Sequence, residues 1–212
     1  MHGPSLPNGH VGTKSASDWA AELGSATQGY SFAPFVATRP LQAARLAKLG
    51  SITASDVVCD LGCGEAALIC ELVRLTGCSA IGCDVDCHAL TRGQGRIDSE
   101  DFAGRVSLTH GLIHTYVQSA AFATATVCFV FLVPQQLDVL TPIFRTYLLA
   151  RLGNRLLSQR FAIAGLTASD QICDESSDAA SGGSAQSRDD YFGSSLGAAF
   201  LYSEQPALVG ET

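Results

Sequence analysis

The chain has 212 residues, 47% of them hydrophobic, which is enough material for one domain with a full core. The formal net charge of −7 provides little positive potential for a phosphate backbone, so we expect no DNA partner, although RNA held by local contacts stays compatible with it. The polar N-terminal residues contain Gly and Pro instead of an apolar run behind a basic start, so neither a signal peptide nor a membrane span is predicted.

Eight cysteines fall mostly within apolar strand or helix patterns, where a thiol behaves as a small hydrophobic group. No C-x-x-C pair exists, and the spacing of Cys83, Cys87 and His88 does not match the paired turns of a zinc site. We therefore predict no metal site. Reduced thiols indicate an intracellular compartment.

The chain begins with a segment that contains few large apolar residues apart from a short possible helix at "ASDWAAEL". Residues 1–30 are rich in Gly, Ser, Ala and Pro, so we predict a flexible N-terminal arm, with residues 31–212 forming a single domain. A helix is predicted over 40–52, where Leu41, Leu46 and Leu49 lie on one stripe and Gly50 marks the end.

From residue 56 onward, strand and helix patterns alternate along the chain. We predict strands over 56–61, 79–86, 105–111, 125–133, 154–166 and 197–204, and helices over 65–77, 87–102 and 134–152. This alternation is typical of an α/β fold whose mostly parallel sheet carries helices on both faces. Residues from about 168 to 190 contain few large side chains, so we predict a disordered loop there.

The stretch "VVCDLGCGEAALICEL", residues 57–72, reads as a buried strand, a glycine turn and a helix. Gly62 and Gly64 allow the backbone to bend sharply and allow a ligand to approach the main chain. The free amides at the helix start then form a site at the carboxyl edge of the sheet, where ligands of open α/β folds bind.

Acidic residues around this turn indicate the charge of the ligand. The spacing alone does not exclude NAD, because Ala67 stands at the third position of a dinucleotide fingerprint. Asp60 and Glu65, however, would repel a pyrophosphate and suit a cationic group. Asp84 ends the next strand, where a carboxylate can hold two ribose hydroxyls, and Asp86 is predicted as an N-cap. A nucleoside with a cationic, amino-acid-like tail meets both demands.

The segment "VVCDLGCGEAAL" followed by "AIGCDVD" resembles the first two motifs of the class I methyltransferases that use S-adenosylmethionine. The resemblance implies a Rossmann-like class I methyltransferase fold with a mostly parallel seven-stranded sheet. It also implies S-adenosyl-L-methionine as cofactor. Residues at matching positions are then expected to bind it, with the methionine part near Asp60, Gly62, Cys63 and Gly64, the ribose on Asp84, and the adenine beside Val85.

Three further segments, "FAPFVATRP", "FVFLVPQQLDVLTPIF" and "RLLSQRFAIAGL", resemble a family of protein lysine N-methyltransferases. That family includes the enzyme acting on the ATP synthase c-subunit and a relative acting on a translation elongation factor. The resemblance implies a protein substrate methylated on a lysine side chain, and it places Phe35, Val36 and Thr38 near the methionine end of the cofactor. Mitochondrial members carry a hydrophobic targeting segment that this sequence does not show, so we expect a cytoplasmic location.

The sequence departs from the wider class at three places. The third strand ends in "THGLIHT", with Leu112 where many members have an acid for the adenine, so backbone groups near Gly111 and Leu112 are expected to hold that ring. The Asn-Pro-Pro-Tyr motif of several amino methyltransferases is absent. The third small residue of the first motif is Ala66 or Ala67 instead of glycine.

The catalytic assignment is restricted to residues that line the substrate channel, because no residue is a convincing general base. Phe131, Pro134 and Gln135 are expected to form one wall, with Phe35 and Thr38 opposite. Positioning supplies much of the catalysis in such a transfer. Two alternatives stay open, a small-molecule or RNA methyltransferase on the same fold and a degenerate domain without turnover. Neither the acceptor nor the oligomeric state follows from the sequence.

Overall fold

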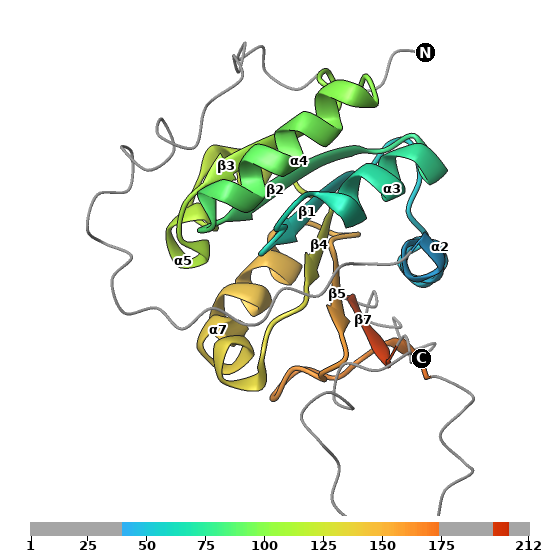
Figure 1. Cartoon of the computed structure of the whole chain (residues 1–212). Coiled ribbons are helices and arrows are strands. Elements are labelled where there is room, and N and C mark those ends of the chain that lie inside the picture. The colour runs from blue at the N-terminus through green and yellow to red at the C-terminus, as the bar shows by residue number, and fades with distance from the viewer. Residues whose placement is uncertain (1–39, 174–196, 204–212) are drawn as a thin grey trace, which may run out of the picture.

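The computed structural model describes residues 40–173 and 197–203, which form a single layered α/β unit (Figure 1). Its sheet has seven strands in the order β3-β2-β1-β4-β5-β7-β6. The strands are β1 Val57–Leu61, β2 Ser79–Asp84, β3 Val106–His110, β4 Val127–Val130, β5 Arg155–Gln159, β6 Asp170–Ile172 and β7 Ala199–Ser203. The helices are α2 Pro40–Leu49, α3 Ala67–Thr76, α4 Cys87–Ser99, α5 Ile113–Tyr116, α6 Ala120–Ala123 and α7 Pro134–Ala150.

Strands β1 to β5 pair in parallel, and β7 pairs antiparallel with both β5 and β6. The predicted mostly parallel seven-stranded sheet is confirmed. The seventh strand, however, lies where a loop was predicted. Asp170–Ile172 form β6 because pairing with β7 satisfies their backbone groups, although Asp170 and Gln171 are polar and exposed. The rest of that predicted loop and the predicted arm at 1–30 lie outside the described residues.

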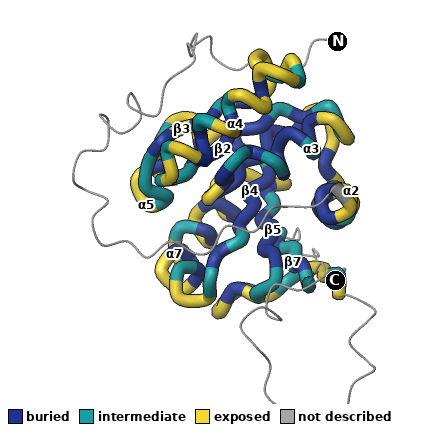
Figure 2. Tube along the Cα trace, viewed as in Figure 1, coloured by how far each residue is buried: buried dark blue, intermediate teal, exposed yellow. Residues whose placement is uncertain are grey.

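Buried residues run through the centre of the sheet (Figure 2). Two clusters of buried hydrophobic side chains cover its two faces. On one face, α2, α3 and α4 pack through residues such as Leu46, Leu72 and Leu90. On the other face, α5, α6 and α7 pack through residues such as Phe122 and Phe144. Two-sided burial explains why the parallel strands read as near-continuous apolar runs instead of alternating ones.

Local signals fix the helix ends. Helix α3 ends at Gly77, which takes a left-handed conformation (φ 73°) and donates its amide to the Val73 carbonyl. Helix α4 begins after Asp86, whose carboxylate accepts hydrogen bonds from two amides of the first turn, so the predicted N-cap is confirmed. Helix α7 begins with Pro134, the position at which proline fits a helix best.

A polar network closes the amino edge of the sheet, opposite the glycine turn. Arg155 pairs with the buried Asp56 and donates to the Gly50 carbonyl at the end of α2 over 2.6 Å. Burial acts to raise the pKa of Asp56, but hydrogen bonds from Thr126 and Thr53 and the Arg155 charge hold it below its ordinary value. The carboxylate therefore stays ionised and fastens α2 to the sheet.

Among the described residues, no helix is long and apolar enough to span a membrane.

Candidate functional site

The glycine turn between β1 and α3 is held against the end of β2 by backbone hydrogen bonds. The amides of Gly62 and Cys63 both donate to the Cys83 carbonyl, over 2.8 Å and 3.1 Å. Gly62 has φ 93° and Gly64 has φ 50°, conformations that a residue with a Cβ adopts at a cost. The two glycines predicted from the sequence thus bend the chain at the carboxyl edge of the sheet.

Asp84 joins the two predicted motifs. Its Oδ2 accepts the Gly64 amide over 2.7 Å, and its Oδ1 accepts the Asp86 amide over 2.9 Å. One carboxylate therefore contacts both the glycine turn and the start of the β2–α4 loop. A carboxylate has about four acceptor positions, so it retains capacity for two hydroxyl donors. This geometry brings the residues expected to hold the methionine part and the ribose into direct contact with each other.

Ala66 occupies the position at which the first motif usually has its third glycine. It precedes α3 with φ 59° and ψ 18°, and it is fully buried. A left-handed conformation costs an L-residue about 1–2 kcal/mol. Of the two alanines that the sequence left open, the structure therefore assigns Ala66 to this position, since Ala67 already belongs to the right-handed α3.

Replacing Ala66 by glycine should leave the free energy of unfolding within about 0.5 kcal/mol of wild type. Relief of the left-handed strain offsets both the lost methyl burial and the greater freedom of glycine in the unfolded chain. The same change at Ala67 should cost up to about 1 kcal/mol, because that residue is helical. Urea denaturation of both variants measures the difference. An equal loss at both positions would contradict the strained assignment.

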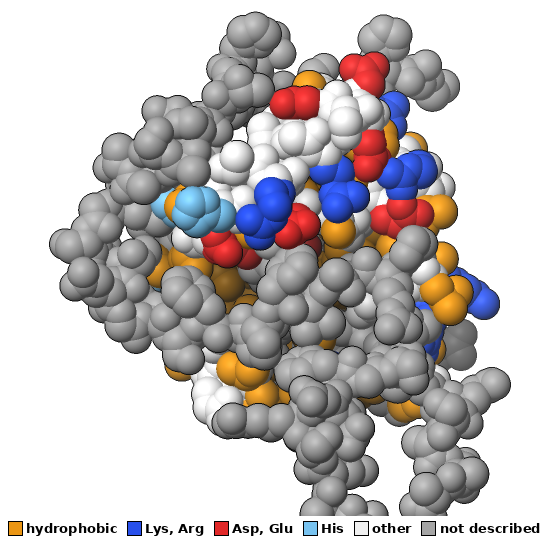
Figure 3. Space-filling view, in the orientation of Figure 1, with side chains coloured by type: hydrophobic (Ala, Val, Ile, Leu, Met, Phe, Trp, Pro, Cys, Tyr) orange, Lys and Arg blue, Asp and Glu red, His pale blue; other side chains and the backbone are white. Residues whose placement is uncertain are grey.

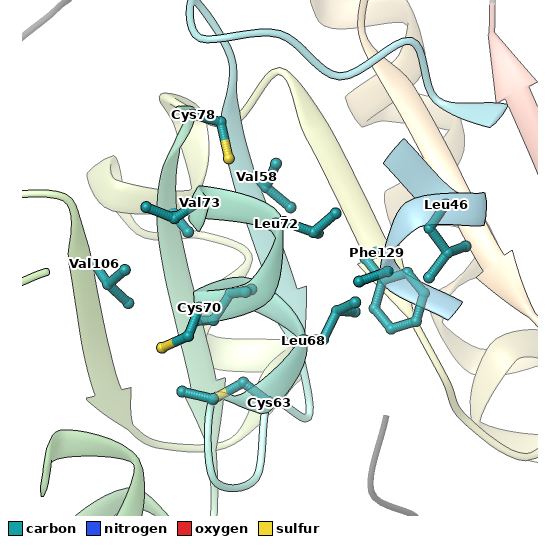
Figure 4. Close-up of a cluster of buried hydrophobic side chains, with 14 of the residues drawn as sticks. Leu46, Val58, Cys63, Leu68, Cys70, Leu72, Val73, Cys78, Val106 and Phe129 are labelled. Carbon is teal, nitrogen blue, oxygen red and sulfur yellow. The ribbon is translucent and has the colours of Figure 1, made fainter. Parts of the chain in front are cut away.

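Cys63 lies within the turn, but its side chain faces the core. It is 6% exposed and belongs to the cluster of buried residues drawn in Figure 4, together with Leu68 and Cys70. A Cβ placed on Gly82 would lie 2.7 Å from its sulfur, so glycine at that position of β2 makes room for the thiol. Burial raises the pKa of Cys63 well above its ordinary value, which excludes a thiolate. Its backbone groups are engaged within the turn as well, because the amide donates to the Cys83 carbonyl and the carbonyl accepts the Ala66 amide over 2.9 Å.

Asp60 is a buried carboxylic acid at the end of β1, with 4% of its surface exposed. Burial, together with the negative charge of Asp84, raises the pKa of Asp60 to about 8. Near neutral pH the ligand-free protein therefore holds a proton on Asp60. A cation placed beside it would favour the ionised form, which is what a sulfonium or ammonium group provides.

Glu65, the second acid of the turn, is compensated by a neighbouring helix. Its Oε1 accepts from Arg92 Nε over 2.6 Å. Helix α4 can approach the glycine turn closely because residue 93 is glycine. A Cβ at that position would lie only 3.0 Å from the Glu65 backbone. Figure 3 shows acidic and basic side chains interspersed over this face. Of the two acids expected to repel a pyrophosphate, Glu65 therefore serves a surface ion pair, and Asp60 is left as the acid that a cation would ionise.

The end of β3 closes the site beside the β2–α4 loop. His110 donates from Nε2 to the Val85 carbonyl over 3.0 Å. The Gly111 amide donates to the Asp84 carbonyl over 2.9 Å, and the Gly111 carbonyl accepts from the Cys83 thiol over 3.4 Å. Both backbone groups of Gly111 are thus engaged. The expected adenine contacts at Val85, Gly111 and Leu112 stay predictions.

The segment between β4 and α7 lies against the glycine turn. A Cβ on Gly62 would lie 3.6 Å from Leu132 Cδ2, which is ordinary van der Waals contact. Phe131 is half-buried, whereas Pro134 and Gln135 are exposed at the start of α7. Phe35 and Thr38, the expected opposite wall, lie outside the described residues. The role of this segment in lining a substrate channel stays a prediction.

Comparisons with known proteins agree with this architecture. No protein-family model matches the chain. A protein described as a protein-lysine N-methyltransferase from Saccharolobus islandicus is 25% identical over 133 residues, which cover 62% of this chain and 79% of that protein. A crystal structure of an RNA methyltransferase from Salinibacter ruber, in complex with S-adenosyl-L-homocysteine, superimposes with a TM-score of 0.64 and 19% identity. That match covers 83% of this chain and 100% of the other.

These likenesses confirm two predictions from the sequence. The chain has the Rossmann-like class I methyltransferase fold. The resemblance to S-adenosylmethionine-dependent methyltransferases, read from the glycine turn and the acid that ends β2, is also confirmed.

Proposed function

We propose that this protein is an S-adenosylmethionine-dependent methyltransferase that methylates lysine side chains of a protein substrate. The single observation that carries the proposal is the contact between the Gly64 amide and the Asp84 carboxylate over 2.7 Å. This contact supports the proposal because Gly64 and Asp84, the residues expected at the amino-acid tail and the ribose, meet at one point of the sheet edge. Leu132 packs beside that point, at the start of the acceptor side.

The residues around the turn fit this ligand chemically. Asp84 keeps acceptor capacity for ribose hydroxyls. Asp60 is a buried acid whose ionised form a cationic tail would stabilise. When bound, S-adenosylmethionine supplies a methyl group on a sulfonium: the amine lone pair forms the C–N bond while the C–S bond breaks and its electron pair stays on sulfur. The positively charged product amine then loses a proton to water.

The acceptor side favours a neutral amine. Phe131 and Leu132 offer an apolar surface, and desolvation lowers the pKa of a lysine ammonium. The N-terminus of α7 adds a partial positive charge that disfavours the ammonium form further. Support for a protein acceptor comes from the description of the Saccharolobus islandicus relative. The apolar residues and the helix place the nucleophile in its reactive state without a general base.

We also propose a cytoplasmic location, on the basis of the thiols. All eight cysteines lie among the described residues and all are free. Burial raises the pKa of Cys83 to about 12 and that of Cys70 to about 11, so these thiols are chemically quiet packing groups. Free thiols in this number are typical of a reducing compartment.

The function is tested by incubating the protein with methyl-labelled S-adenosylmethionine and a lysate that lacks it. We expect label that resists nuclease, is released by protease, and is recovered as methyllysine after acid hydrolysis. Label confined to RNA or to small molecules would overturn the lysine assignment in favour of another methyltransferase. Calorimetry in parallel measures affinity for S-adenosylmethionine, and its absence would indicate a degenerate domain.

A further inference from the structure

Gln136 lies at the boundary between the fourth strand and the acceptor side of the site. It is the third residue of α7, which follows β4 at the carboxyl edge of the sheet. Leu132 of the linking segment lies close to the glycine turn, because a Cβ placed on Gly62 would be 3.6 Å from its Cδ2. Gln136 itself is held by its amide, which donates to the Val133 carbonyl over 3.0 Å. Its side chain therefore starts from a defined backbone position in the first turn of α7, four residues after Leu132.

The side-chain carbonyl of Gln136 is buried without a hydrogen-bond partner among the described residues. Its Oε1 has essentially no exposed surface, although the residue as a whole is half-buried. Leaving such an oxygen unpaired costs about 1–3 kcal/mol. Folded proteins rarely keep a buried carbonyl unpaired, and an ordered water, a bound ligand or a catalytic role accounts for most such groups. The exposed neighbour Gln135 offers no comparable signal.

We propose that Gln136 Oε1 accepts a hydrogen bond from the N–H of the methyl acceptor and thereby positions the nucleophile. This inference rests on the proposed function. A neutral alkylamine has two N–H donors and one lone pair, so a carbonyl that binds one N–H leaves the lone pair free to face the methyl group. An uncharged amide also suits the step, because a carboxylate in its place would stabilise the unreactive ammonium.

Two substitutions separate this role from a structural one. Gln136→Leu removes the carbonyl at similar volume, so we expect at least a tenfold loss in kcat/KM for the acceptor, with unchanged affinity for S-adenosylmethionine and unchanged or higher thermal stability. Gln136→Glu keeps an acceptor oxygen but adds charge, so we expect the rise of rate with pH to move to higher pH. Gln94→Leu, the same change on α4, is the matched control. It should leave kcat/KM, the affinity for S-adenosylmethionine and the thermal stability unaltered.

The rates are measured on the lysate protein fraction that the wild-type enzyme labels, at limiting acceptor concentration. A lowered melting temperature in Gln136→Leu would show that the amide has a structural partner and would overturn the proposal. Unchanged kinetics in Gln136→Leu, or an unshifted pH profile in Gln136→Glu, would do the same while leaving the methyltransferase assignment intact. If wild type binds no S-adenosylmethionine or labels no protein, the proposed function fails first, and the role of Gln136 falls with it.

Discussion

Replacing Asp84 by alanine is expected to weaken S-adenosylmethionine binding by roughly 100-fold or more, since two charge-assisted hydrogen bonds to the ribose would be lost. The change also removes the acceptor of the Gly64 and Asp86 amides, so we expect the melting temperature of the ligand-free protein to fall as well. Titration calorimetry with S-adenosylmethionine and with S-adenosylhomocysteine measures the first effect, and thermal denaturation measures the second.

The control for this experiment is Asp98→Ala, which removes an exposed acid of α4 whose partner is Gln94. We expect its affinity to stay within about threefold of wild type. Wild-type affinity in the Asp84→Ala protein, once its folding is verified, would refute the ribose assignment. A loss confined to stability would instead assign Asp84 a purely structural part.

The affinity for S-adenosylmethionine should rise as pH increases toward about 8, because Asp60 must lose its proton to face a cation. Below that pH the affinity should increase by up to roughly tenfold for each unit of pH. The α-amino group of the ligand titrates near pH 8 as well, so the ratio of wild-type to Asp60→Asn affinity isolates the carboxylate. That ratio should grow with pH and then level off. Glu65→Gln, the control, should keep the wild-type profile because Glu65 is paired at the surface.

Asp60 should also make the stability of the ligand-free protein depend on pH, in the direction opposite to the affinity for S-adenosylmethionine. The folded pKa of Asp60 lies above the value near 4 expected in the unfolded chain, so between those values the native state binds more protons than the unfolded state. Stability of the ligand-free protein should therefore fall as pH rises from about 4 to 8. Asp60→Asn should remove this loss of stability at high pH, so the variant should melt at a higher temperature than wild type at pH 8. It should also bind S-adenosylmethionine more weakly than wild type. A flat wild-type stability profile over that range would contradict the assignment.

Patterns of local origin were predictable from the sequence. The parallel part of the sheet was predictable from the alternation of strands and helices. Its strands are continuous apolar runs because helices bury both of their faces. The glycine turn and Asp84 were recognisable as partners since parallel strands bring their carboxyl ends together, and the Gly64–Asp84 contact meets that expectation. Asp86 was predictable because an N-cap acts within one turn of its own helix.

Features that depend on distant partners were not predictable. β6 is short and polar, and it exists because β7 returns beside it much later in the chain. The pairing of Glu65 with Arg92 links residues 27 positions apart. Gln135 was predicted to line the channel, whereas the buried side-chain carbonyl belongs to Gln136, because the packing of α7 on the sheet decides which glutamine is buried. The buried carbonyl is visible only once that packing is known.

The pairing of Ile172 with Ala199 fixes both ends of the intervening chain to one margin of the domain. β1 and β2, which carry the glycine turn and Asp84, are separated from that margin by β4, β5 and β7. A tag inserted between Ile172 and Ala199 would therefore enter the domain at an edge that three strands separate from the glycine turn.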